Sequence, residues 1–188
     1  MTIKDATQRQ ADFAALYEAH YAAVVAYCRR RSDESTAEDV AHETFLVAWR
    51  RLEQVPADTQ PWLLGVARRE LANARRGQER RQALLDRLAQ VDPPASLAGG
   101  EADPAQISPA LRTALEKLPP AGLEALLLIA WEGLTPAGAA KALGCSQTTL
   151  RARLHRARRA LARALDTAER DAKDHRASAP KATLGQGC

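Results

Sequence analysis

Residues 134–165 of this 188-residue chain constrain the fold more than any other stretch, because they carry the signals of two helices joined by a tight turn. Thr135 is suited to cap the first helix, and Pro136 to occupy its first position. Gly144 is suited to end that helix in the left-handed conformation, and Ser146 to cap the next one. The sequence therefore predicts a helix-turn-helix.

The second helix of this pair has one apolar face and one strongly basic face. Its apolar residues recur at three- and four-residue steps, within a stripe about 80° wide: Leu150, Leu154, Ala157, Leu161 and Leu165. Arginines cover the remaining surface: Arg151, Arg153, Arg156, Arg158, Arg159 and Arg163. No Asp or Glu lies between Ser146 and Leu165. Such a helix packs on a core with one side and presents cations to a polyanion with the other, as a recognition helix in a DNA groove does.

This basic helix has two other possible interpretations. It could be a merely solvated face, or it could bind a membrane surface or a calmodulin-like partner. Membrane-surface helices use large apolar anchors such as Trp or Phe, whereas this stripe consists of Leu and Ala. The capped turn before it also favours DNA binding.

Composition and charge distribution extend this prediction to the whole chain. Aromatic residues make up only 4%, and Ala, Leu and Arg dominate, which favours an all-α protein. The formal net charge is +4, but residues 32–60 carry seven acids and two bases, whereas residues 61–81 carry six Arg and two Glu. Residues 109–165 carry nine bases and three acids. Two basic surfaces and one acidic surface suggest two nucleic-acid contacts and one basic partner.

Cysteine usage and apolar runs exclude several classes. Cys28, Cys145 and Cys188 form no paired motif, so the sequence indicates neither a metal site nor a disulfide framework. The first ten residues lack the apolar core of a signal peptide, and no run of 18 apolar residues exists. We therefore expect a cytoplasmic protein without membrane insertion.

A catalytic role has little support in the sequence. His42 and Glu43 are a possible acid–base pair, but a neighbouring His and Glu in an acidic helix are usually a surface pair. Metalloprotease, phosphate-loop and nucleophile-elbow motifs are missing. We expect a non-enzymatic protein that needs no cofactor.

The chain divides into two helical blocks, which we expect to be separate domains at residues 10–82 and 109–170. Residues 83–108 are predicted as a flexible linker, since 91–107 are rich in Pro and Gly, and residues 171–188 as a disordered tail. In the first block, a helix is expected from about Gln10. Ser35 and Glu38 suggest a capping box for a second helix. A third is expected from Pro61, fraying beyond Gly77.

Together these motifs resemble those of bacterial RNA polymerase sigma factors of the extracytoplasmic-function group. The resemblance is carried, in order, by the pattern AEDxxxETFxxAWR from Ala37, by PWLxxxARR from Pro61, by a Pro/Gly linker, and by RARLHRARRAL from Arg151. It implies two helical domains, regions two and four, that act without a cofactor. It also implies a monomer when free, and core RNA polymerase, promoter DNA and an anti-sigma protein as partners.

The resemblance assigns the polymerase contacts to the helix at residues 37–51. In the family this helix docks on a basic coiled coil of the β′ subunit, which fits the acidic Asp39 and Glu43. His42 stands where the family usually has Gln, and we include it among the polymerase-binding residues. Region four is expected to contact the β flap.

The resemblance also places contacts to the −10 promoter element in the first domain. Residues 53–60 match a loop that traps a base flipped out of the opened element, which brings in Asp58 and Thr59. The following helix supplies further candidates: Arg68, Arg69, Asn73, Arg75 and Arg76. Trp62 could stack on a base, but at the start of this helix we favour a core position.

Contacts to the −35 element are expected from the first turns of the recognition helix, which enter the major groove. The candidates are Ser146, Gln147, Thr148, Thr149, Arg151, Arg153 and Arg156. A free-standing helix-turn-helix regulator is the main alternative, but such proteins usually dimerise, and this reading leaves residues 35–76 unexplained. A pure protein adaptor would leave the arginine-rich helix without a ligand.

Overall fold

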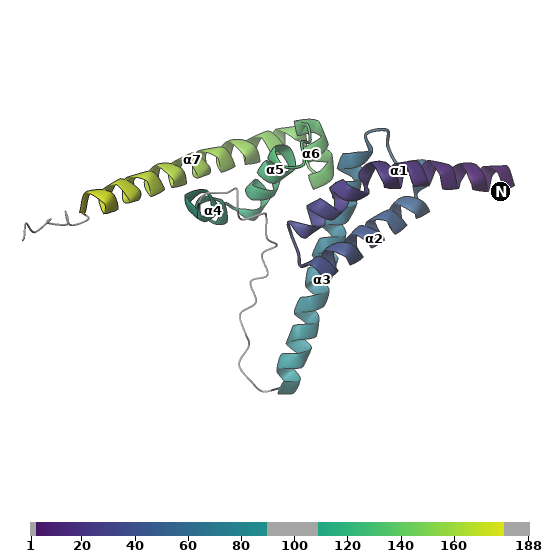
Figure 1. Cartoon of the computed structure of the whole chain (residues 1–188), viewed down its shortest axis with the longest axis horizontal. Helices are drawn as coiled ribbons and strands as arrows, with labels where there is room; N and C mark the ends of the chain where they lie inside the picture. Colours follow the sequence, from purple (N-terminus) through teal and green to yellow (C-terminus); the bar gives the residue numbers. More distant parts are fainter. Residues whose placement is uncertain (1–2, 90–108, 179–188) are drawn as a thin grey trace, which may run out of the picture.

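The computed structural model describes residues 3–89 and 109–178, and every regular element in those ranges is helical (Figure 1). The all-α prediction is therefore confirmed. The elements in chain order are α1 (Ile3–Arg29), α2 (Glu34–Arg50), the short 3₁₀ helix η1 (Leu52–Gln54), α3 (Thr59–Ala89), α4 (Pro109–Glu116), α5 (Pro120–Ala130), α6 (Pro136–Leu143) and α7 (Gln147–Ser178).

The helices α1, α2 and the first half of α3 pack into an N-terminal unit. Its core consists of small and medium apolar side chains: Val24, Tyr27, Cys28, Ala37, Val40, Phe45, Leu63, Leu64 and Ala67. Three aromatic rings of α1 extend this core towards the start of the helix: Phe13, Tyr17 and Tyr21. The Tyr17 and Phe45 centroids are 4.7 Å apart, and Phe13 packs edge-on against Phe45. Trp62 is partly buried against the core, in agreement with the core position favoured for it.

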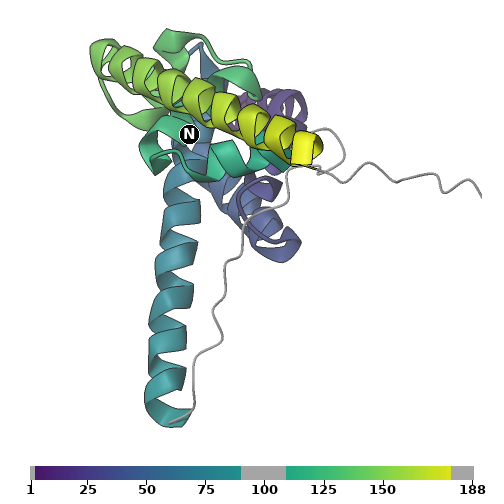
Figure 2. The ribbon, with the colours of Figure 1, turned by 90° about the vertical axis from the view of Figure 1, so that its left-hand side faces the viewer.

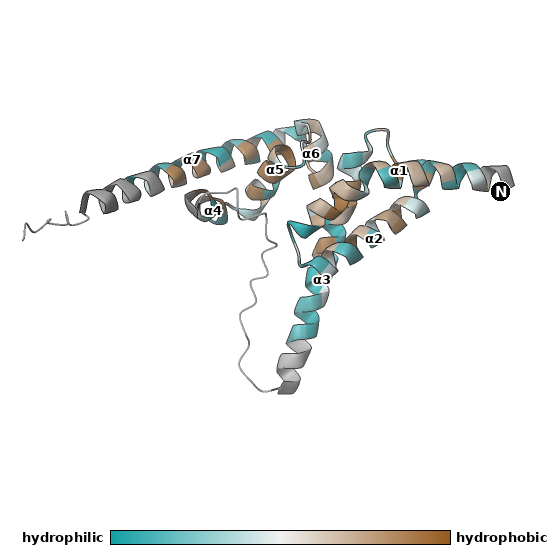
Figure 3. Cartoon of the chain, in the orientation of Figure 1, coloured by the Kyte–Doolittle hydropathy of each residue, from teal (hydrophilic) through white to brown (hydrophobic). Residues whose placement is uncertain are grey.

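The helices α4 to α7 form the C-terminal unit. Leu128 of α5 and Leu150 of α7 are completely buried, and Leu154 is nearly so. The stripe predicted for the recognition helix is thus a core face over its first three turns, where the cost of ordering the helix is offset by apolar burial. Hydropathy along the ribbon shows the difference between the strongly apolar α5 and the largely polar α7 (Figure 3).

Local capping signals specify the helix-turn-helix as expected. The hydroxyl oxygen of Thr135 accepts a 3.1 Å hydrogen bond from the backbone N–H of Gly138, and Ser146 Oγ accepts one of 3.1 Å from Thr149 N. Gly144 has φ of +62°, the left-handed conformation that ends α6. These contacts pair N–H groups that a helix start leaves open.

The cap predicted for α2 is wrong. The structure places Asp33, not Ser35, at the N-cap, where its Oδ1 accepts from Thr36 N at 2.9 Å. The hydroxyl groups of Ser35 and Thr36 also donate to this carboxylate. These three hydrogen bonds hold the pKa of Asp33 below its ordinary value, the backbone contribution from Thr36 being the largest.

Three helices are longer than predicted. α1 begins at Ile3 rather than near Gln10, α3 continues past Gly77 to Ala89, and α7 continues to Ser178. The last two enter ranges predicted as linker and tail, because neither 78–89 nor 166–178 contains Gly or Pro to stop the helix. The Pro/Gly-rich residues 91–107 and the tail beyond residue 178 lie outside the described residues.

The two units contact each other where α3 packs against α6, and ion pairs also join Arg31 to Glu124 and Glu132. A Cβ added to Gly65 would lie 3.3 Å from the carbonyl oxygen of Ala142, so the two helix backbones approach closely there. The distal half of α3 leaves this contact and projects away from the remaining helices, whereas α7 crosses at the opposite end of the molecule (Figure 2).

Candidate nucleic-acid interface

The first turn of α7 presents a short row of polar side chains to solvent. Gln147, Thr148 and Arg151 are exposed, as are Ser146 and Thr149. The last two are already engaged in the cap, since their hydroxyl oxygens lie 2.8 Å apart. Amide and guanidinium groups can contact base edges, so Gln147 and Arg151 remain the best-placed candidates for base recognition.

Arg153 and Arg156 lie on a different side of α7 from Arg151. Two residues correspond to about 200° of rotation around a helix, so Arg151 and Arg153 point in nearly opposite directions. Arg153 and Arg156 line a groove of about 480 Å³ between α7 and the start of α5. Its lining is Pro119, Ala121, Gly122, Arg153, Arg156, Ala157, Arg159, Ala160 and Arg163.

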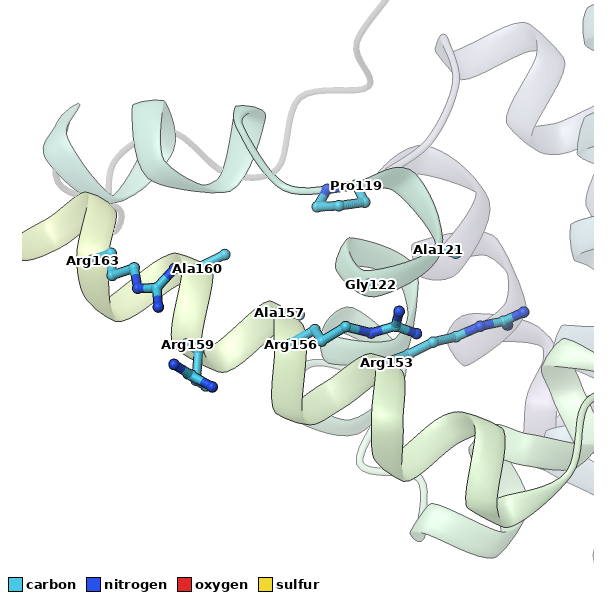
Figure 4. A pocket seen from close by; sticks show the side chains of 9 residues that line it. All are labelled: Pro119, Ala121, Gly122, Arg153, Arg156, Ala157, Arg159, Ala160 and Arg163. Carbon is cyan, nitrogen blue, oxygen red and sulfur yellow. The ribbon is translucent and has the colours of Figure 1, made fainter.

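This groove combines an apolar floor with a cationic rim (Figure 4). Small residues supply the floor, and a Cβ on Gly122 would lie only 3.1 Å from the Cβ of Ala157. Arg159 and Arg163 were not among the predicted site residues. From Arg153 the four arginines follow at steps of three, three and four residues along one helix side, and this spacing is the signal that could have identified the last two.

The basic candidates on α3 follow directly after the buried residues 63–67, and all of them are exposed. Arg68, Arg69, Arg75 and Arg76 face solvent. Asn73 is also exposed, but its amide nitrogen donates to Glu70 at 3.1 Å and its amide oxygen accepts from Arg76. A base edge would have to displace one of these local hydrogen bonds to use Asn73.

The loop between η1 and α3 brings Asp58 and Thr59 to the N-terminal end of α3. The hydroxyl of Thr59 donates to the carbonyl oxygen of Pro56 at 3.0 Å. Asp58 is an exposed ion-pair partner of Lys141, with 3.5 Å between Oδ2 and Nζ. Both predicted contacts of this loop are therefore at the surface but already have partners within the chain.

The outer face of α2 carries the predicted polymerase-binding residues. Asp39, His42 and Glu43 are exposed and fall on one side of the helix. Leu46 and Trp49 continue the same side and are 43% and 36% exposed. The ring of Trp49 packs against Phe13, with 5.1 Å between the ring centroids.

The exposed ring of Trp49 is held in place by the first helix. The Arg9 guanidinium lies over this ring at 5.0 Å and donates to the Trp49 carbonyl oxygen at 2.8 Å. The α2 face is therefore acidic at one end and apolar at the other. Spacing at i, i+3, i+4, i+7 and i+10 from Asp39 is the sequence signal that would have added both apolar residues.

Residues 3–89 and 109–178 offer neither a metal site nor a membrane span. These residues include no group of three or more His, Cys, Asp or Glu side chains that could hold a metal ion. Within the same ranges, no helix is both long and apolar enough to cross a membrane.

Two solved complexes contain a chain with a similar arrangement of helices. The sigma factor RpoE in complex with the anti-sigma factor NepR from Bartonella quintana is 24% identical, with a TM-score of 0.57 over 82% of this chain and 97% of that chain. CnrH in complex with the cytosolic domain of CnrY is 25% identical, with a TM-score of 0.55 over 82% of this chain and 88% of that one. No curated protein matches the chain.

Family models match both units. Sigma-70 region 2 matches residues 16–81, and Sigma-70 region 4 matches residues 108–161, so the two matches together span more than half of the chain. Their order and spacing agree with the resemblance carried by the sequence motifs. The chain therefore belongs to the sigma-70 family, as a sigma factor of the extracytoplasmic-function group.

Proposed function

We propose that this sigma factor is a promoter-specificity subunit that binds core RNA polymerase and recognises −35 and −10 promoter DNA. The observation that carries the proposal is the pairing of two exposed arginine-rich helices, α3 and α7, with a separate acidic surface on α2. DNA would take the cationic surfaces, and a basic partner would take the acidic one. No bond chemistry is required, because binding of melted DNA supplies the free energy of opening.

Recognition of the −35 element is assigned to the start of α7. Gln147, Thr148 and Arg151 lie where a recognition helix meets base edges, and no carboxylate on the first five turns would repel phosphate. Arg153 and Arg156 extend along the groove beside α5. We assign them to phosphate contacts at the edge of the same site.

Recognition of the −10 element is assigned to α3 and the loop before it. Arg68, Arg69, Arg75 and Arg76 supply exposed cations along the helix for the DNA backbone. Asp58 and Thr59 lie at its start, where an unstacked base would be held. In this assignment the arginines hold the strand and the loop selects the base.

Binding to polymerase is assigned to the outer face of α2. Asp39 and Glu43 would pair with the basic β′ coiled coil, and Leu46 and Trp49 would supply apolar contact area beside them. Region four is assigned the contact with the β flap. An anti-sigma protein is a further proposed partner, because in the similar solved structures the sigma factor RpoE is bound to the anti-sigma factor NepR, and CnrH is bound to the cytosolic domain of CnrY.

Co-purification of the tagged full chain with core RNA polymerase tests this proposal. Stoichiometric capture is expected, with Asp39→Arg weakening it about ten-fold or more because a like charge then faces the basic coiled coil. Glu18→Arg is the control, since Glu18 is an exposed acid on α1 outside the proposed surface. Equal capture of the Asp39 variant would reject the docking surface. Tight duplex binding without any capture would favour a free-standing regulator.

A further inference from the structure

The exposed tryptophan of the α2 face is gripped by two side chains of α1, whose first turns run beside the end of α2 (Figure 1). The Arg9 guanidinium lies 5.0 Å from the centroid of the Trp49 ring, and the Phe13 ring packs edge-on against it at 5.1 Å between centroids. Arg9 and Phe13 are four positions apart, so they project from the same side of α1. We call these two residues the α1 clasp.

The guanidinium of the α1 clasp also holds the backbone beneath the ring. Nη2 of Arg9 donates to the carbonyl oxygen of Trp49 at 2.8 Å. Because α2 ends at Arg50, this carbonyl belongs to the last turn, where a helix has no N–H groups of its own left to donate. The helix dipole also favours a cation there. Arg9 therefore holds Trp49 at two points through a planar fork, which the compact ammonium of a lysine does not reproduce.

The other half of the α1 clasp connects the ring to the core. The Phe13 centroid lies 6.5 Å from that of Phe45, whose side chain is only 3% exposed. Trp49 is nevertheless 36% exposed, and Leu46, three residues earlier on α2, is 43% exposed. The α1 clasp thus orients the tryptophan ring without burying it.

Stability alone explains the arginine of the α1 clasp poorly. Nε of Arg9 is buried without a partner among the described residues, and an unpaired buried donor is unfavourable. A cation over a partly exposed ring gives only modest stabilisation in return. An apolar side chain at this position would cover the ring without leaving a buried donor unpaired. The arginine adds a fixed orientation of Trp49, because it binds both the ring and the main chain.

We infer that Arg9 is a positioning residue for polymerase binding, which holds the Trp49 ring in the orientation that contacts the polymerase. The first turns of α1 then belong to the polymerase-binding surface. This inference rests on the proposed function, in which the α2 face binds core polymerase. A side chain that is ordered before binding loses less conformational freedom on binding than a mobile one. Tryptophan is also among the residues that contribute most to binding at protein interfaces.

The charge of Arg9 separates this role from simple attraction between charges. Asp39 and Glu43 on the same α2 face would attract a basic partner, whereas Arg9 would repel it. If charge alone mattered, removal of Arg9 would therefore strengthen binding. Loss of the ring orientation predicts the opposite sign, because the polymerase would then have to order Trp49 itself.

The affinity of the full chain for core polymerase tests the inference. Arg9→Ala should weaken binding about three- to ten-fold, the range expected for one side chain that is ordered on binding. Arg9→Lys keeps the charge without the planar fork and should weaken binding similarly. Gln10→Ala is the matched control, because Gln10 is an exposed neighbour about 100° around α1. Unchanged or tighter binding of Arg9→Ala, or wild-type affinity of Arg9→Lys, would overturn the inference.

A double-mutant cycle shows whether Arg9 acts through Trp49. Trp49→Ala should weaken binding by more than Arg9→Ala does, since it removes the contacting ring. In the Trp49→Ala background, Arg9→Ala should have no further effect, because the ring that it positions is absent. Urea midpoints are measured first, so that only fully folded chains are compared. Additive losses would mean that Arg9 acts independently of Trp49 and would overturn the inference.

The orientation of the ring can be measured without polymerase. Trp62→Phe and Trp131→Phe leave Trp49 as the single tryptophan of the chain. In this background, Arg9→Ala should speed the fluorescence anisotropy decay and increase quenching by acrylamide, whereas Gln10→Ala should change neither. Equal decays of the two variants would overturn the inference. Failure of the proposed function would appear differently, as a wild-type chain that core polymerase does not capture while the anisotropy difference remains.

Discussion

The two arginine-rich helices, α3 and α7, are similar in composition and differ in how they are supported. The start of α3 is buried around its circumference, with Leu63, Leu64, Val66 and Ala67 all at most 3% exposed, because α1, α2 and α6 surround it. The start of α7 is buried on one face, while its other faces meet solvent or the groove beside α5. One helix is therefore a shared core element, and the other is a surface element with a core face.

Core truncation should reveal this difference most strongly. In α3, Leu63→Ala and Leu64→Ala should each lower the free energy of unfolding by about 2–5 kcal/mol, although the two side chains point about 100° apart. In α7, Leu150→Ala should have a similar cost, but its neighbour Arg151→Ala should change stability by no more than about 0.5 kcal/mol. Urea unfolding measures all four variants. If truncation of Leu63 or Leu64 hardly lowered the free energy of unfolding, the position of α3 between its neighbouring helices would be contradicted.

Loss of DNA affinity should distinguish the two sides of α7. Arg151→Ala should cost about 1–3 kcal/mol on a selected −35 duplex and relax the preference at one base pair. Arg156→Ala should weaken binding to all sequences alike and reduce the salt dependence by about one phosphate contact. Gel-shift titrations at two salt concentrations measure both effects. If Arg151→Ala also lost affinity uniformly, its contact would be to phosphate.

The smallest expected effect concerns the helix caps, which differ in the chemical group that accepts the hydrogen bond. α2 is capped by the carboxylate of Asp33, whereas α6 and α7 are capped by the hydroxyls of Thr135 and Ser146. The pKa of Asp33 is lowered in the folded chain, so its stabilisation is present above the unfolded-state pKa and is lost as the pH falls through the folded value. A cap of this kind contributes about 1 kcal/mol at neutral pH.

Asp33→Asn keeps the capping geometry without the charge and is the matched variant for this contrast. The wild-type chain should lose stability relative to Asp33→Asn between about pH 5 and pH 3, and Ser146→Ala should cost about 1 kcal/mol at both pH values. Urea midpoints at each pH measure the differences. A Ser146 effect that changed with pH, or an Asp33 effect that did not, would show that the caps do not act independently.

Sequence patterns succeeded where the determining contacts are local. Thr135, Gly144 and Ser146 each act within four residues along the chain, and the apolar stripe at Leu150 and Leu154 follows from helical period alone. The Asp33 cap was missed because Ser35 and Glu38 form an equally good local pattern, and a carboxylate two residues earlier happens to reach Thr36 N. Local rules do not decide between two overlapping caps.

The contacts between the two units could not be predicted in the same way. Arg31 and Glu132 are 101 residues apart, and neither has a pattern that identifies the other. Neither Arg31 nor Gly65 was among the predicted site residues. Only the packing of the folded chain brings Arg31 next to Glu132 and Gly65 next to Ala142. The DNA- and polymerase-binding residues remain predictions, whose exposure the structure describes.

The continuity of α3 gives the contact at Gly65 a mechanical consequence. The same uninterrupted helix that meets α6 at Gly65 carries Arg76 three turns further on, at a distance of about 16 Å. A helix of this length is stiff, so it acts as a lever arm: a tilt of about 10° at the contact moves the backbone of Arg76 by about 3 Å. That displacement is comparable to the length of a hydrogen bond. A shift of α6 at Gly65 would thus also move the exposed arginines at the far end of α3.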